Sequence, residues 1–150
     1  MTTPDETMMK HAIALAKQAE AIDEVPIGAV VFQGDEIVGE GFNRKEVDND
    51  PTAHAEMIAI ADAAQRLDRW RLQDCTLVVT LEPCPMCAGA LVNARMERVI
   101  YGASDPKAGA CRTLYEISDD PRLNHRCGVT SGVLAEECAD LLSQFFKAKR

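Results

Sequence analysis

The sequence predicts an α/β fold, and three observations support this prediction. Residues 27–32 and 36–42 are β-branched and apolar runs separated by a short turn, a pattern typical of a hairpin. Residues 76–81 form a continuous apolar run, as expected for a strand buried on both faces. A helical segment that begins at Cys84 then leads to another strand at residues 97–102. A strand, a helix and a strand in close succession imply a right-handed crossover between parallel strands.

Helical patterns precede and interrupt these strands. Thr3-Pro4-Asp5-Glu6 has the form of a capping box with proline at the first helical position, and apolar residues then recur at helical spacing over residues 4–20. A second helix is predicted over residues 53–67, with Thr52 as its N-cap. Four residues are predicted to form its buried stripe: Met57, Ile60, Ala61 and Ala64.

The last third of the chain is predicted to consist mainly of loops, followed by one helix. We expect a loop at residues 103–112, a short helix at 113–117, a polar loop at 118–126 and a weak edge strand at 129–132. A final amphipathic helix is predicted on the helical spacing of Leu134, Cys138, Leu141, Leu142 and Phe145. Its last turn is predicted to be basic, with Lys147, Lys149 and Arg150.

Length and composition favour one soluble domain over residues 1–150, because the chain is 47% hydrophobic. The sequence has neither an apolar run of 18 residues nor a signal-like N-terminus, so we expect a cytoplasmic location and no membrane partner. The formal net charge is −8, but the acidity is uneven. Residues 1–52 hold 11 acidic and 4 basic groups, whereas residues 105–150 hold seven of each. A surface that binds a polyanion is therefore expected to use the second half of the chain or a few isolated basic residues.

Two short stretches, His54-Ala55-Glu56 and Pro83-Cys84-Pro85-Met86-Cys87, are predicted to hold the chemistry. Cys84 and Cys87 are three residues apart, so a helix places both thiols on one face, near a helix N-terminus that favours the thiolate. Two thiolates and one imidazole leave one position of a tetrahedral zinc ion open, which is the pattern of a catalytic site. We predict one Zn²⁺ per subunit, bound by His54, Cys84 and Cys87.

Glu56 is predicted to be catalytic and not a ligand. Residues two apart in a regular helix point about 200° away from each other. His54 and Glu56 therefore share a site only if His54 stands at or before the first helical turn. A carboxylate beside a zinc-activated water can take its proton and pass it to a leaving group. The ordered combination of His-x-Glu with Pro-Cys-x-x-Cys is the signature of zinc nucleobase deaminases.

Several alternatives stay open at this stage. A closed structural zinc site would need a fourth ligand from Cys75, Cys111, Cys127, Cys138, His11 or His125, none of which forms a second closely spaced pair. We expect each of these residues to be a buried thiol or a surface group. Asn43 is either a turn former or an amide that faces the substrate. Trp70 is expected to pack at the end of the second helix, with base stacking as the alternative.

Seven segments of the chain are together typical of one enzyme family: VPIGAV (25–30), GFNR (41–44), DPTAHAE (50–56), LEPCPMCAGA (81–90), YGASDPKAG (101–109), NHR (124–126) and FF (145–146). With them the sequence resembles the bacterial tRNA-specific adenosine deaminases of the cytidine deaminase-like superfamily. The resemblance covers nearly the whole chain. It implies a three-layer α/β/α fold around a five-stranded mixed sheet, a homodimer, and hydrolysis of the wobble adenosine of a tRNA anticodon to inosine.

The same resemblance implies roles for individual residues. His54, Cys84 and Cys87 bind zinc, and Glu56 moves the proton. Further residues are implied to hold the flipped base or the anticodon nucleotides around it: Asn43, the backbone of Ala55, Pro83, Asp105, Lys107, Asn124, His125, Phe145 and Phe146. The tRNA anticodon stem-loop is thus the implied partner.

Two other functions remain alternatives. A guanine or cytosine deaminase acting on free bases would have the same zinc core, and Pro85 inside the cysteine pair is similar to what guanine deaminases have. A catalytically silent zinc protein with a binding role is the third possibility. The features that favour RNA are the Phe-Phe-Lys tail and the basic residues on predicted loops, namely Lys107, Arg112, Arg122 and Arg126.

Overall fold

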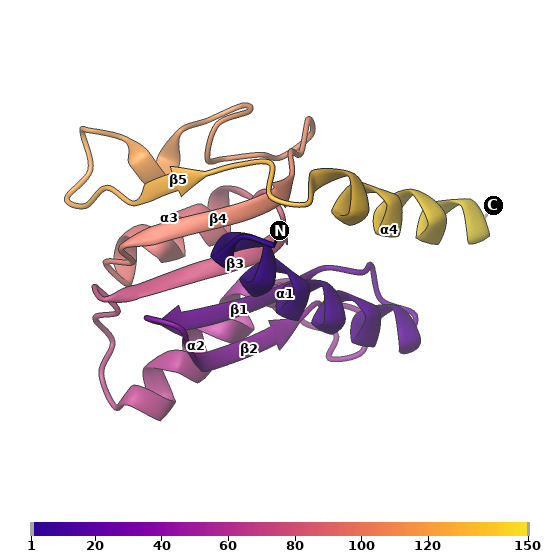
Figure 1. Cartoon of the computed structure of the whole chain (residues 1–150), viewed down its shortest axis with the longest axis horizontal. Coiled ribbons are helices and arrows are strands. Elements are labelled where there is room, and N and C mark those ends of the chain that lie inside the picture. Colours follow the sequence, from indigo (N-terminus) through magenta and orange to yellow (C-terminus); the bar gives the residue numbers. More distant parts are fainter. Residues whose placement is uncertain (1, 150) are drawn as a thin grey trace.

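The structure is a computed structural model in which residues 2–149 are described. The elements in chain order are α1 (Pro4–Ala21), β1 (Gly28–Gln33), β2 (Glu36–Phe42), α2 (Ala55–Leu67), β3 (Cys75–Leu81), α3 (Pro85–Asn93), β4 (Arg98–Ala103), a 3₁₀ turn η1 (Ile117–Asp119), β5 (Gly128–Thr130) and α4 (Ala135–Ala148). All five predicted strands are confirmed to within two residues at either end (Figure 1).

The five strands form one mixed sheet in the order β2-β1-β3-β4-β5. β1 is antiparallel to both of its neighbours, whereas β3, β4 and β5 are mutually parallel, which confirms the predicted parallel crossover. Since only β1 is reversed, the chain leaves β2, β3 and β4 at the same end of the sheet, after Phe42, Leu81 and Ala103. We call this the carboxyl end. The opposite end, where β3 and β4 begin, is the amino end.

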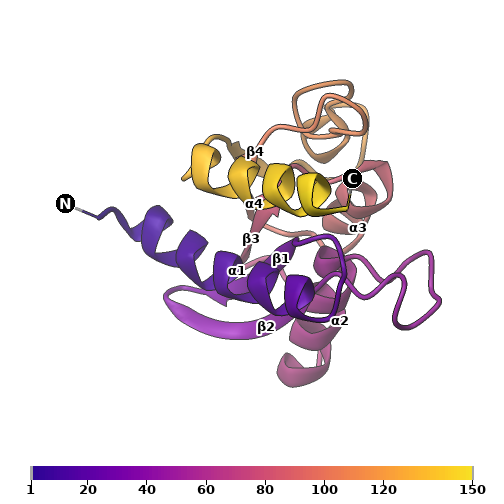
Figure 2. The same cartoon turned by 90° about the vertical axis from the view of Figure 1, so that its right-hand side faces the viewer.

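Helices cover both faces of the sheet, so the predicted three-layer α/β/α fold is confirmed (Figures 1 and 2). Side chains from α1 and α4 pack with Val30, Val78 and Ile100 on one face. Side chains from α2 and α3 pack with Leu77 and Val99 on the other. Within residues 2–149, no helix has the length and apolar character needed to cross a membrane.

The capping box predicted for α1 is present. The hydroxyl oxygen of Thr3 accepts a hydrogen bond from the Glu6 N–H at 3.1 Å, and the Glu6 carboxylate accepts one from the Thr3 N–H at 2.9 Å. Pro4 is the first helical residue, where its missing N–H has no partner to lose. This N-terminus therefore forms as its local sequence predicts.

α2 begins two residues later than predicted. Its N-cap is His54, whose backbone is extended (φ −76°, ψ 150°), and not Thr52. The Thr52 hydroxyl donates instead to the Asp50 carboxylate at 2.8 Å, within the preceding loop. His54 thus lies just outside the helix and Glu56 within its first turn, which is the arrangement that lets both residues reach one site.

The buried side of α2 also differs from the predicted stripe and consists of Ala55, Glu56, Ala59 and Ala63. Of the predicted residues, Ala61 is exposed and Met57, Ile60 and Ala64 are only partly buried. The helix lies very close to β2, because a Cβ on Gly39 or Gly41 would stand 2.4 or 2.5 Å from a helix carbonyl oxygen. Only small side chains fit between backbones this close, so the alanines, and not the larger apolar residues, face the sheet.

The last third of the chain also differs from the prediction in one element. Residues 113–116 form no helix, and the short η1 begins only at Ile117; the backbone N–H groups of residues 111–113 donate to the Glu82 carboxylate. α4 agrees with the prediction, with Cys138 and Phe145 buried and Lys147 in its last turn. Arg150 lies outside the described residues.

Trp70, which is expected to pack at the end of the second helix, follows the last residue of α2 by three positions and is 57% exposed. Its ring lies at the amino end of the sheet, with the guanidinium groups of Arg71 and Arg95 centred 4.7 and 5.9 Å from its centroid. Cation–π contacts with these two arginines therefore hold the ring at the surface beyond the helix end.

Candidate active site

The three predicted zinc ligands come together at the carboxyl end of the sheet. Nδ1 of His54 lies 3.6 Å from Sγ of Cys84 and 3.6 Å from Sγ of Cys87. One ligand atom from each residue lies within 4.8 Å of the other two. With a Zn–S bond of about 2.3 Å and a Zn–N bond of about 2.1 Å, nitrogen and sulfur ligands of a tetrahedral site are about 3.6 Å apart. The donor types and their spacing therefore fit a zinc ion.

Two helix N-termini position these ligands. His54 is the N-cap of α2, and Cys84 is the N-cap of α3, with Pro85 as the first helical residue and Cys87 in the first turn. Hydrogen bonds from Cys87 and His54 lower the pKa of the Cys84 thiol to about 4. The pKa of Cys87 is raised, because it donates to Cys84 and is buried. A bound divalent metal ion would displace the thiol protons, because cysteine binds metals as the thiolate.

No fourth ligand closes the site among residues 2–149, where the cluster contains His54, Cys84 and Cys87 alone. The alternative of a closed structural zinc site is therefore wrong. The remaining cysteines are free and buried, as expected. Burial raises the pKa of the Cys75 and Cys111 thiols to about 11 and of the Cys127 and Cys138 thiols to about 12, so they stay neutral.

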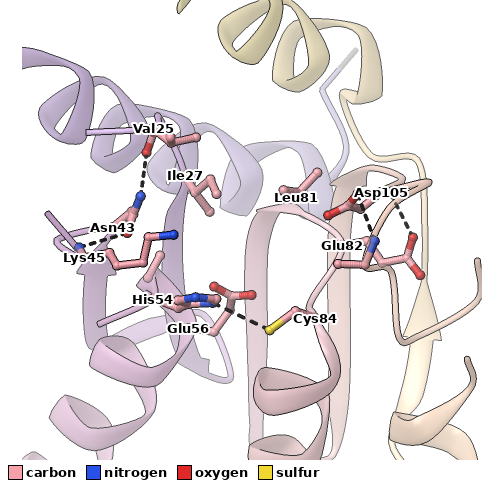
Figure 3. Close-up of a pocket in the computed structure, with 12 residues that line it drawn as sticks. Val25, Ile27, Asn43, Lys45, His54, Glu56, Leu81, Glu82, Cys84 and Asp105 are labelled. Carbon is pink, nitrogen blue, oxygen red and sulfur yellow. Dashed lines mark hydrogen bonds between the residues drawn. The ribbon is translucent and has the colours of Figure 1, made fainter. Parts of the chain in front are cut away.

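Glu56 is a buried carboxyl group beside the three ligands. It is 4% exposed, and Figure 3 shows its side chain converging with those of His54 and Cys84. Burial raises the pKa of Glu56 to about 7, although its own backbone N–H and the nearby His54 act in the opposite direction. A carboxyl group with a pKa near neutrality can both accept and release a proton.

A cavity of about 210 Å³ opens onto the ligands and Glu56. Six of the predicted site residues line it: Asn43, His54, Ala55, Glu56, Cys84 and Asp105. Six further lining residues were not predicted: Val25, Ile27, Lys45, Leu81, Glu82 and Ala108. Of these, Glu82 had a sequence signal, since it is a carboxylate placed directly between a fully apolar strand and the Pro-Cys motif.

Asn43 holds a turn and also lines the cavity. It is buried, its Nδ2 donates to the Val25 carbonyl oxygen at 3.3 Å, and its Oδ1 accepts from the Lys45 N–H at 3.2 Å (Figure 3). These bonds hold the turn after β2. One N–H and one lone pair of the amide are left for a molecule in the cavity.

Three other predicted residues lie in or beside the loop on the opposite side of the cavity. Asp105 lines the cavity and accepts hydrogen bonds from the N–H groups of Lys107 and Ala108 at 2.9 and 3.3 Å. Pro83 is buried and does not line the cavity; its carbonyl oxygen accepts from the Ala110 N–H at 2.9 Å. Lys107 is exposed, two residues along the chain from Asp105.

Asn124 and His125 do not reach this cavity within one chain. Nε2 of His125 lies 2.6 Å from the carbonyl oxygen of Met96, which directly precedes β4. This contact holds His125 at the amino end of the sheet. Asn124 beside it is exposed.

The two phenylalanines at the end of α4 lie near the cavity but differ in exposure. Phe145 is buried and shares with Val25 and Ile22 the lining of a second hollow, and Val25 also lines the first cavity. Phe146 is 48% exposed, with its ring 5.5 Å from that of Phe145. Only Phe146 is therefore available for stacking at the surface.

Three arginines expected to favour RNA form ion pairs within their own loops. Arg112 and Arg126 contact the Asp119 carboxylate at 3.2 and 2.9 Å, and Arg122 contacts Asp120 at 2.7 Å. Their charges are thus largely neutralised locally. Lys45 lines the cavity and Lys107 is exposed on the loop that contains Asp105, and neither lysine forms an ion pair within residues 2–149.

Comparisons with known proteins agree with this geometry. Residues 2–103 match the cytidine and deoxycytidylate deaminase zinc-binding region. A tRNA-specific adenosine deaminase of Haemophilus influenzae is 51% identical over 147 residues, which cover 97% of this chain and 85% of the relative. A solved structure from work on A-to-I editing by tRNA:A34 deaminases at the wobble position of transfer RNA has a TM-score of 0.87 and 41% identity, covering 91% of this chain and 99% of the other.

A guanine deaminase of Bacillus subtilis is similar to a smaller part of the chain. Its structure is 44% identical, but the match covers only 66% of this chain and 64% of the other, with a TM-score of 0.64. The two solved structures thus differ little in identity and much in how far the likeness extends. A second guanine deaminase structure, from Nitrosomonas europaea, matches 97% of this chain and 85% of its own with a TM-score of 0.82, but at only 24% identity, so that likeness shows the fold alone.

Proposed function

The chain belongs to the zinc-binding family of cytidine and deoxycytidylate deaminases and, within it, to the tRNA-specific adenosine deaminases, and from this premise we propose that it converts the wobble adenosine of a tRNA anticodon to inosine. The observation that carries the proposal is an open three-ligand zinc site with a buried, non-ligating carboxyl group on the wall of the same cavity. A purely structural zinc site needs neither feature.

His54, Cys84 and Cys87 would hold one zinc ion in each subunit. When bound, zinc acts as a Lewis acid that brings the pKa of a water molecule down towards neutrality. Glu56 takes one proton from the attacking water and delivers it to a ring nitrogen of the purine, and it then carries the remaining hydroxyl proton to the amino group, which leaves as ammonia. Its burial favours this exchange, because a carboxyl group with a pKa near 7 changes protonation state readily at neutral pH.

The walls of the cavity would orient the base. The free N–H and lone pair of the Asn43 amide are suited to an edge of the purine, and the backbone of Ala55 lies beside them. Pro83 lies between the lining residues Glu82 and Cys84 and would act on the base through their placement, and Asp105 lines the cavity from the other side. Each of these assignments predicts a loss of substrate affinity on substitution and no loss of zinc.

RNA is the substrate class that this cavity favours. Proteins that read RNA sequence prefer single-stranded loops whose bases can be turned outward, and an anticodon loop provides such a base at little unstacking cost. Lys107 on the rim would contact a phosphate, and Phe146 would stack on a neighbouring base. We also propose that the enzyme is a cytoplasmic homodimer with one deaminase domain over residues 1–150. Sedimentation of the purified protein measures its oligomeric state.

A direct test offers the zinc-loaded enzyme an anticodon stem-loop with adenosine at the wobble position and, in parallel, guanine, cytosine and cytidine. We expect ammonia from the stem-loop alone, with inosine at the wobble position. A stem-loop with guanosine at that position is the matched control. Ammonia from free guanine in the absence of RNA turnover would replace this function with guanine deamination, and no ammonia from any of them would make the protein a silent zinc binder.

A further inference from the structure

A second buried carboxylate, Glu82, lies in the cavity wall and has no part in the chemistry proposed above. It directly follows β3 and is 2% exposed. Burying a charged carboxylate has a high free-energy cost unless hydrogen bonds replace the lost water. The positions of those hydrogen bonds therefore indicate what the residue does.

Five hydrogen bonds converge on Glu82. Oε1 accepts from the Asp105 N–H at 3.1 Å and from the Thr113 hydroxyl at 2.5 Å. Oε2 accepts from the N–H groups of Cys111, Arg112 and Thr113 at 3.2, 2.8 and 3.0 Å. All five donors belong to residues 105–113, a segment with turns but no helix or strand. The carboxylate thus supplies the acceptors that regular secondary structure would otherwise provide.

The contact is also close from the side of the loop. A Cβ on Gly109 would lie 2.4 Å from Oε1 of Glu82. Any larger residue at this position would push the loop away from the carboxylate. Glu82 and Gly109 are therefore two independent positions at which the same contact can be disturbed.

The loop held in this way forms one side of the cavity. Asp105 and Ala108 line the cavity together with Glu82 itself, and Lys107 lies exposed between them in the sequence (Figure 3). We propose that Glu82 is a positioning residue, which fixes loop 105–113 in the shape that receives the nucleotides flanking the target base. The inference rests on the proposed function for its substrate, but its structural part is measurable without turnover.

The test is Glu82→Gln, which keeps the side-chain shape and replaces one acceptor oxygen by an NH₂ group facing N–H donors. Hydrogen exchange should speed up at Asp105 and at residues 111–113, while α2 and β3 keep their protection. Because buried donors lose their acceptor, KM for the stem-loop should rise about 10- to 100-fold. We expect kcat to change less than threefold and the zinc content to stay at one per chain.

Gly109→Ala should reproduce the exchange pattern and the rise in KM from the opposite side of the contact. Asp74→Asn, which alters an exposed carboxylate at the amino end, is the matched control and should change neither. Unchanged exchange at residues 105–113 in both variants would overturn the proposal. So would a fall in kcat at constant KM, or a loss of protection throughout the fold. A wild-type enzyme that is inactive on RNA would defeat the proposed function and leave the exchange result intact.

Discussion

The two ends of the sheet differ in how deeply their charged side chains are buried. At the carboxyl end Glu24, Glu56 and Glu82 are 1–4% exposed, and two of them accept backbone hydrogen bonds from the loops that follow β2 and β4. At the amino end Arg69 is paired with Asp74 at the surface, and Trp70 is flanked by arginines. Buried, hydrogen-bonded charges fix a geometry, whereas exposed pairs contribute little to it. Substitutions at the carboxyl end should therefore change activity much more than substitutions at the amino end.

The largest effect is expected at Glu56. Glu56→Ala should retain one zinc per chain and lower kcat by about 10²- to 10⁴-fold, because proton transfer loses its carrier. Turnover measured with a saturating stem-loop, alongside zinc analysis, tests this. His54→Ala is the informative companion, since it should lose the metal as well. Activity of Glu56→Ala within tenfold of the wild type would remove Glu56 from the mechanism.

A smaller effect is expected at Asn43, which shapes the cavity without taking part in proton transfer. Asn43→Ala removes the amide contacts to Val25 and Lys45 and the group that faces the base, so kcat/KM should fall about 10- to 100-fold. Steady-state kinetics on the stem-loop measure the change. Asn43→Asp keeps the acceptor and should recover part of the loss. Equal activity of all three proteins would show that the amide does not meet the substrate.

The salt dependence of stem-loop affinity distinguishes an unpaired cation, Lys107, from a paired one, Arg122. Stem-loop affinity should fall with increasing salt, and Lys107→Ala should make the slope of log K against log salt shallower by about 0.7. Arg122→Ala should leave that slope unchanged, because Arg122 is already paired with Asp120. Fluorescence anisotropy at four or five salt concentrations gives both slopes. A larger change for Arg122 than for Lys107 would reverse the expected order.

The smallest effect on catalysis is expected at His125. His125→Ala removes the contact with the Met96 carbonyl and should lower the free energy of unfolding by about 1 kcal/mol. The single-turnover rate constant should stay within threefold of wild type, since the residue lies at the amino end. A marked loss of stem-loop affinity in a stably folded variant would instead mean that RNA contacts this end, on the same or a second copy of the chain.

The chemistry at the carboxyl end could be predicted because it depends on short spacings. The three-residue interval between Cys84 and Cys87, next to prolines and a buried strand, places both thiols at a helix N-terminus whatever the rest of the chain does. The capping box at Thr3 and the hairpin are local in the same sense. The meeting of His54 with the cysteines is long-range, and it was predicted from ligand chemistry and not from periodicity.

The errors share one cause, which is that partners distant in the sequence decided the outcome. The buried face of α2 was set by two glycines of β2, and the backbone of residues 111–113 turns towards the carboxylate of Glu82. The arginines of the loops were neutralised by Asp119 and Asp120, which composition alone counts but does not place. Hydrophobic periodicity ranks residues by size and polarity, and it does not contain the distance between two backbones.

The tip of the hairpin between β1 and β2 is a suitable place to insert a tag. Gly34 stands at the turn between β1 and β2, at the amino end, and a side chain there would meet no atom within 4 Å. Its φ of +64° makes a substitution at this residue strained, whereas exposed loop tips commonly accept insertions. A short peptide tag inserted at this tip would attach the enzyme to a surface or accept a fluorophore. The cavity at the carboxyl end would remain open to the solution.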